Sequence, residues 1–243
     1  MAAIPALDNL LVRPSLAPDQ PADGVPGLFV RQVRRAPAAI AIESDRESLT
    51  YAHLNARVNQ LAHHLMAKGI RAPSTVAVLL GEPVPVVIAL LAVLKAGGTY
   101  VSLDARDTAD RIHRSMRDAE VAMILTDRAM ARKVRAVGIP TILLDVDPAP
   151  AKRPGRDPEV PIDQDQLAVV TGARGADGAP TPASYTHREL LRHAAEQRSW
   201  AGTGRPGARH ASLAGEPAVT MCVPLLLGGT LVLAAERGNS AEL

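Results

Sequence analysis

The stretch Val76–Val101, VAVLLGEPVPVVIALLAVLKAGGTYV, decides the fold of this chain. Its first residues, Val76–Leu80, form the kind of short apolar run that is typical of a buried strand, and Thr99–Val101 forms a second one. Between them, Val86–Lys95 is long enough for an apolar helix, and the pair Gly97-Gly98 that follows is a helix-ending signal. A strand, a helix and a strand in this order predict a parallel sheet covered by helices.

The same alternation continues on both sides of this stretch. The sequence predicts further helices at Tyr51–Lys68, Thr108–Ala119, Arg128–Val137 and His187–Gln197. It predicts further strands at Ile40–Glu43, Ala122–Thr126, Thr141–Leu144, Leu167–Val170 and Thr230–Ala234, with turns at Ser44–Glu47 and Gly202–Arg209. The predicted fold class is therefore α/β, with parallel sheets covered by helices.

Changes in composition divide the chain into four parts. Residues 1–24 are rich in Pro, Ala and Asp and are predicted to be a leader or linker. Residues 25–146 form a first α/β subdomain. Residues 147–162 contain five prolines and mixed charges, which indicates an exposed connection. Residues 163–243 are predicted to form an incomplete second α/β subdomain.

Composition excludes several classes of function. The chain has 243 residues, 47% of them hydrophobic, so it can bury a sizeable core. With 27 Lys and Arg against 25 Asp and Glu, and only 2% aromatic residues, neither a nucleic-acid nor an anionic-membrane partner is expected. The single cysteine, Cys222, allows no internal disulfide, and no signal peptide or membrane span is evident. We therefore expect a cytoplasmic protein.

Four motifs carry a resemblance to a known family. Leu94–Asp104, LKAGGTYVSLD, resembles the signature LKAGxAYVPLD of adenylation domains in nonribosomal peptide synthetases, which are adenylate-forming (AMP-binding) enzymes. Leu49–Asn55, Val25–Pro37 and Leu231–Glu236 resemble other family segments in the right order. The resemblance implies the N-terminal part of the adenylate-forming fold, and a family activity in which ATP and Mg²⁺ serve to adenylate an amino acid.

The segment Ala173–Pro182, ARGADGAPTP, resembles the family's phosphate loop, YTSGSTGxPKG, but most of its chemistry is replaced. Gly175, Gly178 and Pro180 fall on the family's two glycines and proline. Thr181 falls on the lysine and Pro182 on the last glycine, while Ala173, Arg174, Ala176 and Asp177 replace the hydroxyl-rich positions. Phosphate loops need backbone N–H groups, hydroxyls and a cation, so we expect a vestigial loop with poor ATP affinity. The two glycines alone are also compatible with a surface loop that binds nothing.

The substrate end of the resembled family is changed as well. Gly215 falls on the aspartate that pairs with the substrate ammonium group in the family, and the neighbouring Glu216 is out of register. The family's later motifs, including its adenine-binding and catalytic lysine segments, would lie beyond Leu243. We therefore predict no catalytic residue in this chain and no cofactor, with ATP and Mg²⁺ bound only where residual family activity survives.

Two hypotheses follow. The first is a truncated, degenerate adenylation-domain homologue that cannot activate an amino acid by itself and serves as an interaction or structural element. Its expected partners are a synthetase module, an MbtH-like accessory protein near Asp118–Leu125, or a second copy that covers the incomplete second sheet. The alternative is one half of a split adenylating enzyme completed by another chain. A decayed gene product without a selected role is a third reading.

The remaining candidate residues have structural interpretations. Lys95 is expected to cap the C-terminus of its helix, and Asp104 to serve a turn or a helix N-cap. His63 and His64 are adjacent on a helix and cannot share one face as metal ligands, and no other cluster has metal-ligand spacing. Cys222 is expected to pack in the core. A weak anion site is considered at the start of the helix that begins with His187.

Overall fold

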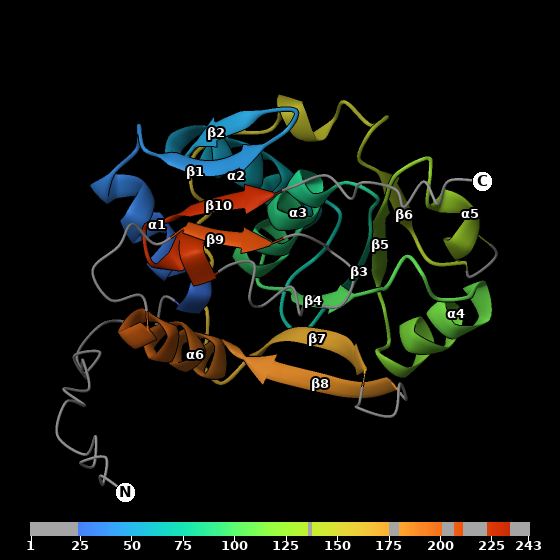
Figure 1. Ribbon diagram of the computed structural model, residues 1–243. Coiled ribbons are helices and arrows are strands. Elements are labelled where there is room, and N and C mark those ends of the chain that lie inside the picture. Colours follow the sequence, from blue (N-terminus) through green and yellow to red (C-terminus); the bar gives the residue numbers. More distant parts are fainter. Residues whose placement is uncertain (1–23, 136–137, 175–179, 201–206, 211–222, 234–243) are drawn as a thin grey trace, which may run out of the picture.

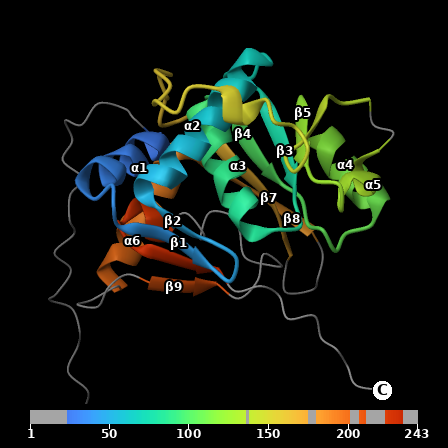
Figure 2. The same ribbon diagram turned by 90° about the horizontal axis from the view of Figure 1, so that it is seen from above.

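The computed structural model describes residues 24–135, 138–174, 180–200, 207–210 and 223–233, which form two sheets with helices packed on them (Figure 1; Figure 2). The first half contains α1 (Gly24–Arg35), β1 (Ile40–Ser44), β2 (Ser48–Thr50), α2 (Tyr51–Ala67), β3 (Thr75–Leu79), α3 (Pro83–Lys95), β4 (Thr99–Ser102) and α4 (Ala109–Asp118). The second half contains β5 (Met123–Thr126), α5 (Ala131–Val134), β6 (Thr141–Leu143), the 3₁₀ turn η1 (Pro150–Lys152), β7 (Leu167–Arg174), β8 (Pro180–Thr186), α6 (His187–Trp200), β9 (Gly207–His210) and β10 (Thr230–Leu233).

The larger sheet has six strands in the order β6-β5-β3-β4-β7-β8. Its first five strands are parallel, and β8 is antiparallel to β7 at one edge. The central register places Val76 beside both Tyr100 of β4 and Met123 of β5. These strands are apolar on both faces because helices cover both sides, as parallel sheets require.

The smaller sheet has four strands in the order β2-β1-β10-β9. Strand β10 is parallel to both β1 and β9, and β2 is antiparallel to β1. Each sheet therefore combines strands from residues 25–146 with strands from residues 163–243. The sequence boundary at 147–162 does not divide the molecule into two separate sheets.

Helix α3 lies at the centre of the molecule. Eleven of its residues are buried, on all sides of the helix, which is the pattern of a helix enclosed by other elements. The main hydrophobic core joins α3 to side chains of both sheets, such as Ile42 and Leu231 in one and Val78 and Val169 in the other. A second, smaller core lies under α4 and α5, where Ile112, Met116 and Val134 meet the six-stranded sheet.

Tyr51 joins the start of α2 to a segment far along the chain. Its buried hydroxyl lies 2.7 Å from the carbonyl oxygen of Gly229 and 3.1 Å from that of Leu225. Burial raises the pKa of the Tyr51 hydroxyl, which therefore remains a neutral donor. This contact fixes the turn that leads into β10, and so helps to place β10 beside β1.

The predicted α/β class with helix-covered sheets is confirmed, with two antiparallel edge strands added to the parallel ones. Three strands were not predicted. Strand β2 follows the expected turn, β8 occupies residues assigned to the phosphate loop, and β9 occupies part of the expected turn Gly202–Arg209. These strands contain Pro, Gly or Ser and carry no apolar run, so pairing with neighbouring strands defines them instead. Within the described part of the chain, no helix combines the length and the apolar character that a membrane span requires.

We predict that Tyr51→Phe lowers the free energy of unfolding by about 1–2 kcal/mol, because it removes the donor for two buried carbonyls while keeping the ring. Urea denaturation followed by circular dichroism measures the change. Tyr185→Phe is the matched control, since the partly buried Tyr185 hydroxyl forms no hydrogen bond within the described residues. Equal stability of the two variants would contradict the role given to Tyr51.

Candidate functional site

The phosphate-loop positions lie at the end of the hairpin formed by β7 and β8. Gly175 and Gly178 fall in residues 175–179, outside the described residues. Pro180 and Thr181 begin β8, where they pair with Arg174 and Ala173 of β7. Pairing of the hairpin therefore reaches residues 174 and 180, and the connection between its strands consists of GADGA.

Proline occupies two positions of this hairpin. Pro180 pairs with Arg174 and Pro182 pairs with Gly172. Neither proline has a backbone N–H, so neither can donate a hydrogen bond to β7 or to a ligand. Proline is tolerated here because β8 is the edge strand of the sheet and pairs with a neighbouring strand on one side only. One further polar group of β7, the buried hydroxyl of Thr171, finds no hydrogen-bond partner in the part of the chain that the structure describes.

The start of α6 follows the hairpin directly and is capped by its own side chains. The Thr186 hydroxyl accepts a hydrogen bond from the Glu189 backbone N–H, and the Glu189 carboxylate accepts one from the Thr186 backbone N–H at 2.8 Å. This reciprocal pair is a capping box. The hydrogen bonds from Thr186 lower the pKa of the Glu189 carboxyl, which is therefore ionised at neutral pH. The position considered for a weak anion site thus already holds a carboxylate.

His187, the first residue of α6, is fully buried beside the start of α1. Its Nδ1 atom accepts a hydrogen bond from the backbone N–H of Val25 at 3.3 Å, and its Nε2 atom has no hydrogen-bond partner among the described residues. Burial lowers the pKa of His187 to about 4, although the nearby Asp163 opposes this shift. A neutral imidazole that accepts at Nδ1 carries its proton on Nε2. His187 therefore ties α6 to α1 as a neutral residue.

Lys95 is not the helix cap that its position suggests. Its side chain is 3% exposed, and its Nζ atom donates to Asn55 Oδ1 (2.6 Å), Asn59 Oδ1 (2.7 Å) and Asp157 Oδ1 (2.6 Å). An ammonium group has three N–H donors, so this arrangement satisfies it completely. The ammonium also lies 5.6 Å from the centre of the Phe29 ring. The expected cap is corrected because α3 ends inside the core, where solvent cannot hydrate the charge.

The Lys95 cluster holds the connection 147–162 against α2. Asp157 comes from this connection, and Asn59 also donates to the carbonyl oxygen of Gly155 at 2.8 Å. Burial lowers the pKa of Lys95, while Asp157 opposes that shift. Burial raises the pKa of Asp157, but the bonds from Lys95, Asn55 and Asn59 outweigh burial and lower it overall. Most residues of the connection are exposed, and a charged pair anchors it to the rest of the fold.

Three of the remaining candidates are described. Asp104 serves a turn, as expected: its carboxylate accepts from the backbone N–H of Arg106 and pairs with that guanidinium. His63 contacts the carbonyl oxygen of Arg156. His64 is buried, and neither of its ring nitrogens forms a hydrogen bond with a described residue, although its Nε2 atom lies 3.7 Å from Asp147 Oδ2. Burial lowers the pKa of His64, and Asp147 opposes this shift.

Gly215 and Cys222 lie outside the described residues. Within the part that the structure describes, no group of three or more His, Cys, Asp or Glu side chains is arranged to hold a metal ion.

Sequence reasoning missed the partners of Lys95 and the burial of His187. Asn55 and Asn59 are four residues apart on a predicted helix, so they share one face, and this spacing was the available signal. Nothing in the sequence links that face to Asp157, which lies 62 residues after Lys95.

The chain belongs to the family of AMP-binding enzymes, whose profile matches residues 29–242. It is 37% identical over 166 residues to malpinin synthetase from Mortierella alpina, and the alignment covers 68% of this chain and 2% of that protein. It is 35% identical over 180 residues to phosphinothricin tripeptide synthetase PhsC from Streptomyces viridochromogenes, and that alignment covers 70% of this chain and 16% of that protein. The chain therefore spans a small part of these relatives.

Solved structures show the same fold. The Klebsiella oxytoca NpsA N-terminal subdomain, in complex with 3-hydroxybenzoyl-AMSN, matches with a TM-score of 0.76 at 18% identity, over 88% of this chain and 54% of that one. The nonribosomal peptide synthetase FmoA3, in its α-methyl-L-serine-AMP bound form, matches with a TM-score of 0.75 at 23% identity, over 88% of this chain and 24% of that one. The chain is similar to the N-terminal part of a nonribosomal peptide synthetase adenylation domain.

We predict that Asp157→Ala lowers the free energy of unfolding by about 2–3 kcal/mol, because the buried Lys95 ammonium loses its counter-charge. The value is below that of a fully buried pair since the Asp157 side chain is 35% exposed. Urea denaturation measures the loss. Asp165→Ala removes the partner of the exposed Arg188 instead and should leave the midpoint nearly unchanged. An Asp157→Ala variant as stable as this control would show that the cluster does not anchor the connection.

We predict that the chain loses about 2 kcal/mol of stability between pH 7 and pH 5 through His187. The folded pKa of about 4 lies below the unfolded value of 6.5, so the unfolded state binds more protons in this window. Stability is therefore present above pH 6.5 and falls as the pH decreases toward 4. Urea titrations at both pH values should show a smaller loss for His187→Gln. The buried His64 adds a loss of the same sign, which that variant retains. An identical pH dependence in wild type and His187→Gln would refute the assignment.

Proposed function

We propose that this chain is an adenylation-domain-like element of nonribosomal peptide synthesis that does not activate an amino acid with ATP by itself. It acts instead as an interaction or structural element. The observation that supports this proposal is that Pro180, Thr181 and Pro182, which the sequence resemblance aligns with the family's proline, lysine and last glycine, lie in β8 and pair with β7.

Within its described residues, the hairpin lacks several of the groups that bind phosphate. A phosphate-binding loop surrounds its ligand with backbone N–H donors and adds a lysine that reaches the outer phosphates. Here Pro180 and Pro182 supply no N–H, and Thr181 supplies no charge. The connection GADGA contains no hydroxyl side chain, and Asp177 within it offsets the charge of Arg174. A polyphosphate would therefore meet fewer donors and no net positive charge.

The start of α6 does not replace these groups. A helix N-terminus attracts anions through its unpaired N–H groups and its dipole. In this chain the first two N–H groups of α6, those of His187 and Arg188, donate to the carbonyl oxygens of Gln166 and Gln164, and the Glu189 N–H donates to the Thr186 hydroxyl. The Glu189 carboxylate accepts from the Thr186 N–H just before the helix. A phosphate would have to displace an ionised carboxylate that is hydrogen-bonded in place.

An interaction role agrees with the kind of protein in which similar sequences occur. The relatives named above are peptide synthetases, of which this chain spans a small part. The proposed partners are therefore a synthetase module, an MbtH-like accessory protein near Asp118–Leu125, or a second copy of the chain. We place this role in the cytoplasm, since the sequence offers one cysteine and so no internal disulfide.

A split adenylating enzyme is the second candidate. Two observations favour it: Gly175 and Gly178 keep the loop's backbone freedom, and the fold aligns over 88% of the chain with a solved N-terminal subdomain. A neighbouring reading frame that carries the remaining adenylation motifs in matching register would favour the split enzyme. A neighbouring intact synthetase would favour the interaction element.

We predict that the purified chain catalyses no ATP–pyrophosphate exchange with any proteinogenic amino acid. Restoring two loop positions in Thr181→Lys/Pro182→Gly should raise ATP affinity, because it returns a cation and a backbone donor. Thermal unfolding with and without Mg·ATP reports this affinity, since a ligand that binds only the folded state raises Tm.

Thr181→Gln/Pro182→Gly is the matched control, which restores the backbone donor without the charge. The lysine variant should show a larger Mg·ATP-dependent rise in Tm than this control and than wild type. Pyrophosphate exchange by the wild-type chain would overturn the proposal. Equal Tm shifts in the lysine and glutamine variants would show that the missing charge is not what limits ATP binding.

A further inference from the structure

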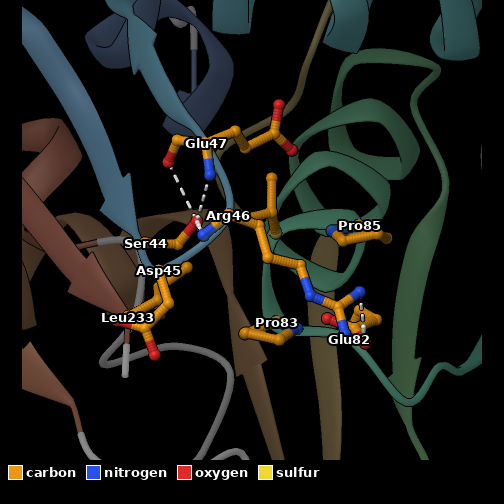
Figure 3. Close-up of a pocket in the computed structure, with 9 residues that line it drawn as sticks. Ser44, Asp45, Arg46, Glu47, Glu82, Pro83, Pro85 and Leu233 are labelled. Carbon is orange, nitrogen blue, oxygen red and sulfur yellow. Dashed lines mark hydrogen bonds and ion pairs between the residues drawn. The ribbon is translucent and has the colours of Figure 1, made fainter. Parts of the chain in front are cut away.

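A cavity of about 150 Å³ opens between the tip of the β1–β2 hairpin and the first turn of α3 (Figure 3). Ser44 and Leu233, the paired last residues of the parallel strands β1 and β10, line it on one side, and Pro83, Val84 and Pro85 of α3 line the other. The carboxyl ends of parallel strands are where α/β proteins commonly bind ligands. The cavity therefore lies at a favourable place for a small molecule.

The size of the cavity limits its occupant. An apolar cavity of similar volume holds a molecule as large as benzene, whereas pockets for larger ligands measure roughly 300–1,000 Å³. A nucleotide is therefore too large, and a single amino-acid side chain fits. The proline rings, Val84 and Leu233 offer such a side chain an apolar surface.

One ion pair has both of its members in the cavity wall. Arg46 Nη1 lies 2.9 Å from Glu82 Oε1, and Figure 3 shows the Arg46 side chain reaching from the hairpin to Glu82 beside Pro83. Both side chains are exposed to solvent. An exposed pair contributes little to stability, so a ligand can open it at small cost. Glu47, which also lines the cavity, is paired with Arg57 outside it.

The backbone segments that carry Arg46 and Glu82 differ in what they offer a ligand. The Ser44 hydroxyl accepts from the backbone N–H groups of Arg46 and Glu47, and it donates to the carbonyl oxygen of Glu47. This network fixes the turn that carries Arg46. On the other side, Pro83 and Pro85 leave the first turn of α3 with few N–H donors, so side chains rather than helix backbone must recognise a ligand.

We propose that this cavity binds a free amino acid with an apolar side chain, as the zwitterion. The ligand carboxylate takes the place of Glu82 on Arg46, the ligand ammonium takes the place of Arg46 on Glu82, and the side chain enters the apolar cavity. When the pair opens, its positive and negative side chains can each form a charge-assisted hydrogen bond with the oppositely charged group of a zwitterion. The site uses none of the phosphate-loop positions and does not involve Gly215, so it stands independently of the proposed function.

The test is a titration of the ¹⁵N-labelled chain with L-leucine, followed by the backbone amide signals. Binding should shift the signals of Ser44–Glu47, Val84 and Leu233. N-acetyl-leucine lacks the ammonium, leucinamide lacks the carboxylate and glycine lacks the side chain, so each should bind more weakly. Arg46→Gln and Glu82→Gln should each weaken leucine binding by about twofold to fivefold.

Arg188→Gln, which breaks an exposed ion pair away from the cavity, is the matched control and should bind leucine as wild type does. The exchanged pair Arg46→Glu/Glu82→Arg keeps opposite charges across the cavity and should bind better than either single variant. The proposal is overturned if leucine shifts none of these signals, if it shifts only signals elsewhere, or if N-acetyl-leucine and leucinamide bind as well as leucine.

Discussion

Helix α3 is apolar on every side, and the rest of the structure follows from the need to cover it. One surface of a helix can pack on one sheet, so a helix with no polar face must lie between layers. The two sheets and α2 supply those layers, and a single hydrophobic core joins them around α3. This requirement explains why strands from both ends of the described chain share the two sheets, and why a boundary drawn from prolines does not separate them.

The same enclosure buries a charged group, the Lys95 ammonium. Lys95 ends α3 where no water reaches, so its charge needs acceptors supplied by the protein. Asn55 and Asn59 provide two acceptors and Asp157 provides the counter-charge, which draws the proline-rich connection onto α2. The connection 147–162, whose composition indicates an exposed linker, is therefore held to the fold because Lys95 of α3 needs its carboxylate.

Local pattern predicted the core elements and failed where pairing or distance decided the structure. Helix α2 and strands β3 and β5 were predicted to within a residue or two, because each has a clear apolar period. Strand β8 was not, because its Pro180 and Pro182 remove the pattern and only pairing with β7 makes it a strand. For the candidate site, the phosphate-loop positions were assigned from their resemblance to the family, and this assignment stays a prediction. Thr186 and Glu189 stand at the spacing of a capping box, so the sequence contained a signal for the capped start of α6 that the prediction did not use.

The account holds that a family fold persists here while its phosphate-binding chemistry does not. Titration calorimetry of the wild-type chain with Mg·ATP at millimolar concentration tests this most directly. The account predicts no saturable heat, because the sequence has no lysine at the loop positions and places two prolines, which lack a backbone N–H, at Pro180 and Pro182. A clear saturable isotherm would contradict it, and would mean that the backbone of this hairpin still holds the nucleotide.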